Sequence, residues 1–270
     1  MASRALRGPP AGPPPPEADA CVVQAEEVRA DGGVALVAFP GQGLAATLAT
    51  GYLAEALKLR PVGRLDCSTL PAVAIVEQGE VVHPIRLLFG LDRRTKTKTH
   101  PLVAFLSEVP LDEETLRPAA AAILAWCQSN GIKSIISMES AAFDGNPDDD
   151  ARLVQLWGIS NRAATNKKLA AAKLAMAKEG IVSGLTGALL DQGLETDIDI
   201  IALVAVGGGL EPDVRAASRL VEFLAKFLGL PVPLARLRRE TERFEKHLKD
   251  IERRRNASQS EPAADPQEFI

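Results

Sequence analysis

The chain has 270 residues, of which 46% are hydrophobic and 24% are charged, and its formal net charge is −4. This length and composition are sufficient for a hydrophobic core in one large domain or two small ones. The nearly balanced charge provides no overall field for nucleic acid or for an anionic membrane, so we expect neither as a partner. No segment approaches the ~20 consecutive apolar residues of a membrane-spanning helix, and no apolar signal region follows Met1, so we expect a cytoplasmic protein.

The three cysteines, Cys21, Cys67 and Cys127, are odd in number, widely spaced and without a CxxC pair. This pattern argues against a disulfide framework and against a conventional zinc site built from these residues alone. We therefore expect three small buried hydrophobic side chains in a protein of a reducing compartment. A reactive thiol is the alternative at each position.

The N-terminal arm, residues 1–20, is rich in proline. Proline supplies no backbone donor and fixes φ, so this arm is predicted to be polyproline II or coil rather than part of a fold. Apolar patterning then predicts a buried strand, a helix and a β-hairpin turning at Gln78-Gly79. In chain order these elements lie at 34–39, 44–59, and 73–76 with 81–88.

The alternation of strand and helix continues as far as residue 228. The further predicted elements are strands at 101–106, 132–137, 153–159 and 198–206, and helices at 112–130, 163–178 and 212–228. Alternation of this kind predicts an α/β domain over residues 21–231, with one largely parallel sheet covered by helices on both faces. The β-hairpin is expected as an insertion in this domain.

Residues 232–255 predict a charged amphipathic helix, because apolar residues recur there at alternating spacings of three and four. These positions are Leu234, Leu237, Thr241, Phe244, Leu248 and Ile251. Such a helix either packs on its own domain or projects and pairs with another subunit or partner. Interleaved acidic residues argue against a membrane-surface helix and against a nucleic-acid-binding helix.

A flexible tail is predicted at residues 256–270, which end in Glu268-Phe269-Ile270. Two large apolar residues at the end of a polar segment bury nothing locally. They are either incidental or a short anchor, in which Phe269 enters a pocket and the terminal carboxylate of Ile270 meets a cation. A linker of this length spans roughly 20 Å, so an anchor could reach a partner at some distance from the folded body.

Catalytic chemistry is not indicated by any pattern in the chain. Three stretches are rich in glycine, at 41–43, 184–187 and 207–209. The first and third follow predicted strands, where tight turns are favoured and anion binding is the alternative. The first lacks the features of a P-loop or a dinucleotide fingerprint. No nucleophile motif accompanies a histidine, and the acidic turn 144–150 lacks EF-hand spacing. We predict no catalytic, cofactor-binding or metal-binding residue.

Five segments in matching order resemble the archaeal branch of the proteasome assembly chaperone 2 family. They are Phe39-Pro40-Gly41-Gln42-Gly43, 101–110, Trp157-Gly158-Ile159-Ser160, 180–190 and Pro212-Asp213-Val214-Arg215-Ala216-Ala217. The resemblance covers nearly everything between the two terminal arms. It implies a three-layer α/β/α sandwich similar to nucleoside phosphorylases, a homo-oligomer, binding to the proteasome α-ring, and no known catalytic activity.

The resemblance also bears on the C-terminus. Members of the family can end in a hydrophobic–tyrosine–any tail that inserts between α subunits. Phe269 stands at the tyrosine position and Ile270 at the last position, whereas Glu268 stands where the family has a hydrophobic residue. The resemblance thus implies that Phe269 and Ile270 bind proteasome α subunits or a related ring. From the amphipathic pattern, Phe244, Leu248 and Ile251 are further partner-binding candidates.

Two functions from different classes remain open on the sequence. The first is a non-enzymatic scaffold or chaperone that binds another protein. The second is a protein or enzyme that binds a small molecule, a nucleoside or phosphate, in a phosphorylase-like cleft. Ligands of open α/β sheets tend to bind at strand ends, where the glycine-rich stretches are expected.

Overall fold

The computed structural model describes residues 21–95, 98–142, 155–207, 212–239 and 241–243. The elements of the first half are β1 (Cys21–Ala25), β2 (Val34–Ala38), η1 (Gln42–Leu44), α1 (Ala45–Leu57), β3 (Arg60–Cys67), β4 (Ile75–Glu77), β5 (Glu80–Val82), β6 (Ile85–Thr95) and β7 (Lys98–Ser107). Those of the second half are α2 (Glu113–Ser129), β8 (Ser134–Ala142), β9 (Gln155–Ser160), α3 (Ala163–Ala171), β10 (Ala175–Met176), α4 (Gly184–Gln192), η2 (Gly193–Glu195), β11 (Asp199–Gly207) and α5 (Val214–Leu228).

The main sheet has the strand order β1-β3-β6-β7-β2-β8-β11-β9-β10. Its centre, β7-β2-β8-β11, is parallel, and Leu36 of β2 lies between Ala104 of β7 and Ile136 of β8. The pairs β1–β3, β3–β6, β6–β7 and β9–β11 are antiparallel. The sheet is therefore mixed rather than largely parallel, because a long β6–β7 hairpin and two further antiparallel strands extend one side.

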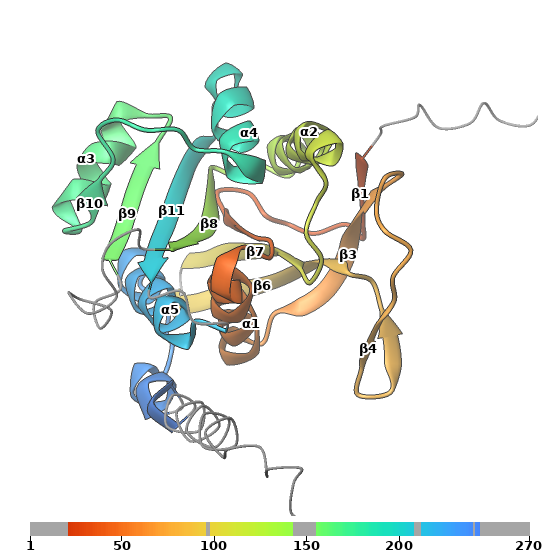
Figure 1. Cartoon of the computed structure of the whole chain (residues 1–270), viewed down its shortest axis with the longest axis horizontal. Coiled ribbons are helices and arrows are strands. Elements are labelled where there is room, and N and C mark those ends of the chain that lie inside the picture. Colours follow the sequence, from red (N-terminus) through yellow and green to blue (C-terminus); the bar gives the residue numbers. More distant parts are fainter. Residues whose placement is uncertain (1–20, 96–97, 143–154, 208–211, 240, 244–270) are drawn as a thin grey trace, which may run out of the picture.

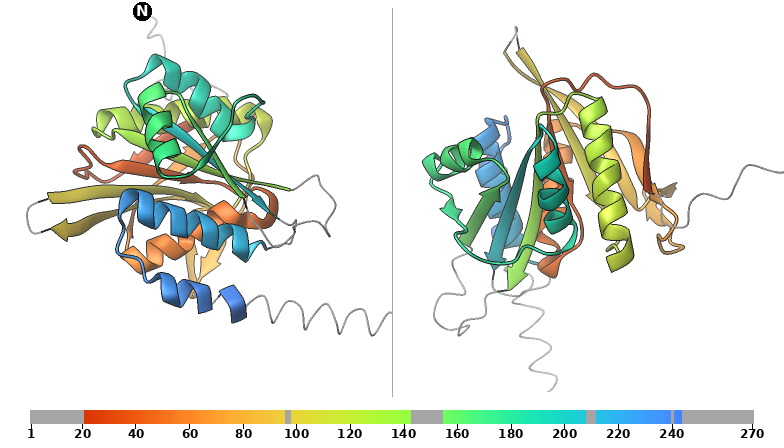
Figure 2. Two further views of the ribbon diagram at one scale, coloured as in Figure 1. Left: turned by 90° about the vertical axis from the view of Figure 1, so that its left-hand side faces the viewer. Right: turned by 90° about the horizontal axis from the view of Figure 1, so that it is seen from above.

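Helices cover both faces of this sheet (Figures 1 and 2). One core cluster joins α1 and α5 to one face, and a second joins α2 and α4 to the other. Side chains alternate between the clusters along β7, where Leu106 faces α1 and Phe105 faces α2, as the two-residue period of a strand requires. Phe105 is fully buried and meets Trp126 of α2 edge-to-face, with ring centroids 5.8 Å apart. The predicted α/β architecture with helices on both faces is confirmed.

The predicted hairpin forms, but its second arm is shorter than expected. β4 and β5 pair as a separate two-stranded sheet, and the turn residues Gln78 and Gly79 both have positive φ. This conformation suits a tight hairpin turn. The expected arm 81–88 divides at Pro84, which has no backbone donor: β5 ends at Val82 and β6 begins in the main sheet at Ile85.

One predicted helix boundary is wrong, and one helix was not predicted. The helix expected at 163–178 ends at Ala171, because Lys173 adopts a left-handed conformation with φ of 62° and the chain then enters β10. The stretch that begins at Gly184 was predicted only as glycine-rich sequence, and it forms helix α4 instead. Gly184 has φ of +66°, so the turn into α4 uses a conformation that other residues rarely adopt.

The cysteine prediction is wrong for two of the three residues. Cys21 and Cys67 form a disulfide between β1 and β3, where they are directly paired across the two strands. Spacing along the chain could not show this, because the 46-residue separation is closed by strand pairing. Cys127 is a free, buried side chain as expected. Among the described helices, none is long and apolar enough to cross a membrane.

Candidate functional site

The partner-binding residues predicted from the sequence, Phe244, Leu248, Ile251, Phe269 and Ile270, lie outside the described residues. So do residues 208–209 of the third glycine-rich stretch and the acidic turn 144–150.

The described beginning of the C-terminal segment packs on its own domain. Helical backbone is present at 234–239 and 241–243. Leu237 is buried in the cluster that contains α1 and α5, and Leu234 packs against the same cluster. Tyr52 of α1 donates a hydrogen bond to the carbonyl oxygen of Pro233, and Arg238 pairs with Glu222 of α5 at 2.7 Å. For Leu234 and Leu237, the packed interpretation of the amphipathic pattern is therefore correct.

A groove of about 1250 Å³ lies beside this contact, between α1 and the β4–β5 hairpin. Leu48 and Tyr52 line it from α1, Leu88 and Leu106 from β6 and β7, and Val82 from the hairpin. Polar lining residues also contribute to it: Gln24, Glu55, Lys58, Arg64, Glu77, Gln78, Glu80, His83, Arg86 and Glu108. The groove thus combines an apolar floor with a charged rim, as protein-binding surfaces do.

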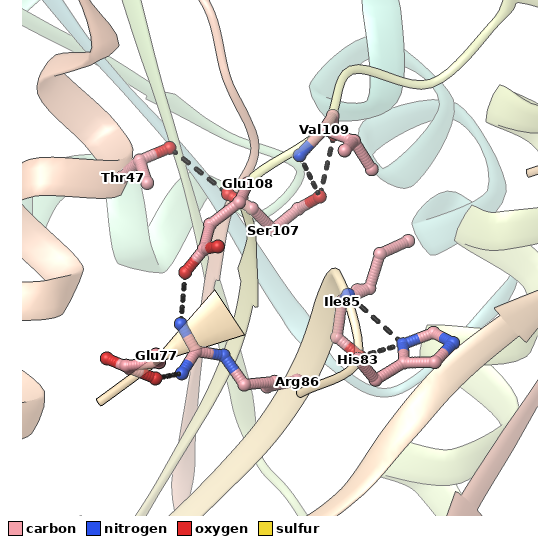
Figure 3. Close-up of polar contacts among 8 residues, drawn as sticks. All are labelled: Thr47, Glu77, His83, Ile85, Arg86, Ser107, Glu108 and Val109. Carbon is pink, nitrogen blue, oxygen red and sulfur yellow. Dashed lines mark hydrogen bonds and ion pairs between the residues drawn. The ribbon is translucent and has the colours of Figure 1, made fainter. Parts of the chain in front are cut away.

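Arg86 fastens the hairpin to the sheet at this groove (Figure 3). Its guanidinium donates to the carboxylate of Glu77 on β4 and to the carboxylate of Glu108, which follows β7. The Arg86 side chain is only 15% exposed, whereas Glu77 is 54% and Glu108 28% exposed. A forked guanidinium suits such bridging. Because the Arg86–Glu108 contact is less exposed to water, it is the stronger of the two.

The segment after β7 is held by further polar contacts. The hydroxyl of Ser107, fully buried, donates to the carbonyl oxygen of Val109 at 2.7 Å, and the Thr47 hydroxyl donates to the Ser107 carbonyl oxygen at 3.4 Å. The Ile85 amide donates to Nδ1 of His83 at 3.1 Å (Figure 3). The contacts of His83 with Ile85 thus stabilise the turn between the hairpin and the main sheet, which is a structural role.

The outward face of the hairpin carries an apolar pair. Val76 and Val81 are directly opposite each other across β4 and β5, and they are 69% and 74% exposed. Glu77 and Glu80 form the next pair and line the groove, because successive side chains of a strand point to opposite faces. An isolated two-stranded hairpin is marginally stable in water, so the Arg86 contacts hold in place an element with an exposed apolar face.

A second polar cluster consists of Ser137 and Glu139 on β8, beside the last residues of β2, and Thr186 on α4; we call it the crest. Thr186, near the start of α4, donates to Oε1 of Glu139 at 2.6 Å, and its hydroxyl oxygen lies 2.7 Å from that of Ser137. Burial raises the pKa of Glu139, and the Thr186 hydrogen bond lowers it by a smaller amount. The crest therefore holds a carboxyl group that protonates more readily than an ordinary glutamate.

The first glycine-rich stretch passes beside this carboxyl group. A Cβ added to Gly41 would lie 3.5 Å from Oε2 of Glu139. Gly43 has φ of 68°, and Leu44 follows it at 55°, so the chain turns sharply from β2 into α1. The turn interpretation is thereby confirmed for Gly43. Glu139, which the sequence pattern did not single out, is thus an acidic group beside the first glycine-rich stretch.

Neither the Arg86 contacts nor the cluster around Glu139 was predicted from the sequence. Arg86 lies in an ordinary alternating strand, and its acidic partners are nine residues before it and 22 residues after it. Glu139 follows the predicted strand 132–137, but nothing local indicates that a threonine from α4 meets it. Across the described ranges, no group of three or more His, Cys, Asp or Glu residues is placed to hold a metal ion.

The described part of the chain forms a mixed α/β sheet with helices on both faces. The PAC2 family model matches residues 35–252. The chain therefore belongs to the PAC2 family, as its resemblance to proteasome assembly chaperone 2 proteins implied.

Solved structures and one curated relative agree with this assignment. The chain is similar to Pyrococcus furiosus PbaA, an archaeal homolog of proteasome-assembly chaperone, with a TM-score of 0.73, 22% identity, and coverage of 88% of this chain and 94% of PbaA. It is similar to Pyrococcus furiosus PbaB, an archaeal proteasome activator, with a TM-score of 0.73, 18% identity, and coverage of 86% and 99%. An uncharacterized protein of Methanocaldococcus jannaschii is 23% identical over 85% of this chain and 89% of its own length.

Proposed function

We propose that the chain is a non-enzymatic protein-binding scaffold, a proteasome assembly chaperone or a factor that binds the proteasome α-ring. Membership of the PAC2 family carries this proposal. Similarity to PbaA and PbaB along most of both chains supports it. The partner is a proteasome α subunit or a related ring, and the scaffold works as a homo-oligomer in the cytoplasm.

The anchor in this proposal is the C-terminal tail. Phe269 enters a pocket between subunits of the ring, and the carboxylate of Ile270 pairs with a cation there. The helix of residues 232–255 contacts the cluster of α1 and α5 near its start, through Leu234 and Leu237. Its residues Phe244, Leu248 and Ile251 supply further apolar contact to a partner or to another subunit. Residues 256–267 connect this helix to the anchor.

Binding to purified α-ring tests the anchor with matched variants. The full chain is compared with a chain ending at Gln267, with Phe269→Ala, and with Phe227→Ala, whose aromatic side chain packs in the body. The proposal expects the shortened chain and Phe269→Ala to bind about tenfold or more weakly than the full chain, as loss of a buried aromatic anchor does. Phe227→Ala should keep the affinity of the full chain. Equal affinity of the full and shortened chains would contradict the anchor, and absence of binding by both would contradict the partner.

A second candidate function rests on the crest. Glu139 has a raised pKa, one oxygen bonded to Thr186 and the other beside Gly41. A fold similar to nucleoside phosphorylases would place a nucleoside or phosphate at such a strand-end site. Thermal unfolding with nucleosides, nucleotides and phosphate tests it, with Glu139→Gln as the matched variant. Saturable stabilisation of the wild type that Glu139→Gln lacks would support ligand binding. If none of these compounds stabilises the wild type, this candidate function is wrong.

A further inference from the structure

The edge strand β1 pairs with β3 over its whole length, but its side chains are only partly covered. None of its five residues is fully buried, and Val22 is 51% exposed. Among the described strands β3 is its one neighbour in the main sheet, so its other backbone edge has no described strand beside it. Cys21 and Val23 pack partly against the cluster beneath α2. Burial of apolar surface is the main source of strand stability, and β1 has little of it.

The two ends of β1 are secured differently. At the C-terminal end, the amide of Glu26 donates to the carbonyl oxygen of Val62 at 2.9 Å, and the Glu26 carboxylate pairs with Arg60. Both side chains of that ion pair are more than half exposed, so it contributes little. At the N-terminal end the disulfide joins Cys21, the first residue of β1, to Cys67, the last residue of β3.

A surface pocket leads to this disulfide. The pocket has a volume of about 470 Å³ and is lined by Cys67 together with Leu70, Val73 and His83. Cys67 itself is 5% exposed, and this pocket is the surface opening beside it. Cys127, by contrast, is fully buried and burial raises its pKa, so it stays a thiol that takes no part in exchange.

We propose that the Cys21–Cys67 disulfide is a redox latch on strand β1. The thiolate of a dithiol attacks Sγ of Cys67, the Cys21–Cys67 bond breaks, and Cys21 leaves as a thiolate that takes up a proton. The second thiol of the reductant then attacks the mixed disulfide, releasing Cys67 as a thiol. The protein disulfide gains two electrons and two protons, and the dithiol is oxidised to its own disulfide.

When the disulfide is reduced, β1 separates from β3, starting at its Cys21 end. The outer edge of β3, whose backbone groups β1 now covers, then becomes a free sheet edge that can accept a strand. The core beneath is retained, because β3 keeps its pairing with β6 and its buried residues Val62 and Leu65. In a reducing compartment the open state dominates, and oxidising conditions close the edge.

Thiol counting on the folded full chain establishes the two states. The sequence has three cysteines, and Cys127 is shielded. A thiol reagent is therefore expected to label no cysteine in the air-oxidised chain and two after dithiothreitol treatment. Cys127→Ala should leave both results unchanged. If the oxidised chain already shows Cys21 and Cys67 as labelled thiols, the latch does not exist.

Amide hydrogen exchange, read by mass spectrometry, then tests the movement. Reduction is expected to speed exchange at 21–26 by about tenfold or more, while β8 and β11 at the centre of the sheet keep their rates. Cys21→Ser with Cys67→Ser should give the fast rate with or without dithiothreitol. Unchanged exchange at 21–26 overturns the proposal. An equal rise in β1 and β8 also overturns it, because the disulfide would then stabilise the whole fold and not one strand.

Discussion

The Arg86 contacts predict that this side chain helps to hold the β4–β5 hairpin against the sheet. Arg86→Met keeps most of the aliphatic stem and removes the guanidinium that bridges Glu77 and Glu108. The carboxylate of Glu108, 28% exposed, then loses a charged partner in a partly buried setting. Leaving such a group unpaired costs about 1–3 kcal/mol. The exposed Glu77 adds less than about 1 kcal/mol. We expect a total loss of about 2 kcal/mol in the free energy of unfolding.

Two matched variants separate the contributions. Glu77→Gln breaks only the contact to the hairpin, so it should cost less than about 1 kcal/mol in global stability. Glu108→Gln breaks only the contact to the segment after β7 and should cost more, because that pair is less exposed. Amide exchange at 75–82 should rise in Arg86→Met and Glu77→Gln, and stay near the wild-type rate in Glu108→Gln.

Chemical denaturation at neutral pH measures the stabilities, and hydrogen exchange measures the hairpin. Two results would refute the reasoning. One is a hairpin equally protected in Arg86→Met and in the wild type, which would mean that its own pairing and turn suffice. The other is a larger stability loss for Glu77→Gln than for Glu108→Gln, which would mean that exposure does not rank the two pairs.

Two further predictions concern stability. Phe105→Ala should cost about 3–5 kcal/mol, because the side chain is fully buried against Trp126, and a loss below about 1 kcal/mol in denaturant titration would show that the core refills the space. Glu139 has a raised pKa in the fold, so its contribution to stability is full below the pKa of an unfolded glutamate and is lost as pH rises through the folded value. Glu139→Gln should therefore flatten the pH dependence measured by thermal unfolding, and an unchanged profile would contradict the assignment.

The sequence predicted the centre of the fold well because the central strands are continuous apolar runs. The runs at 34–39, 101–106 and 198–206 all lie in the parallel part of the sheet, where both faces are covered by helices. Strands that are buried on both faces carry this strong signal. The helix from Ala45 was equally clear, since its apolar positions recur at helical spacing.

The edge of the sheet was missed for the opposite reason. β1 is only five residues long, and β3 includes Pro61 and Gly63, which weaken a strand pattern. The Cys21–Cys67 disulfide depends on pairing between segments far apart in sequence. The pattern of residues along the chain does not show such pairing. The same limit applies to the Arg86 contacts.

Recovery of proteasome α subunits from native lysate tests the central claim most directly. The chain carries a tag at its N-terminus, so that the carboxylate of Ile270 stays free, and it is compared with a shortened chain ending at Gln267. We predict that the full chain recovers α subunits and the shortened chain does not. Recovery by both would keep the partner and place the contact on the folded body or on helix 232–255. Recovery by neither would contradict the proposed function and leave small-molecule binding at Glu139 as the function to test.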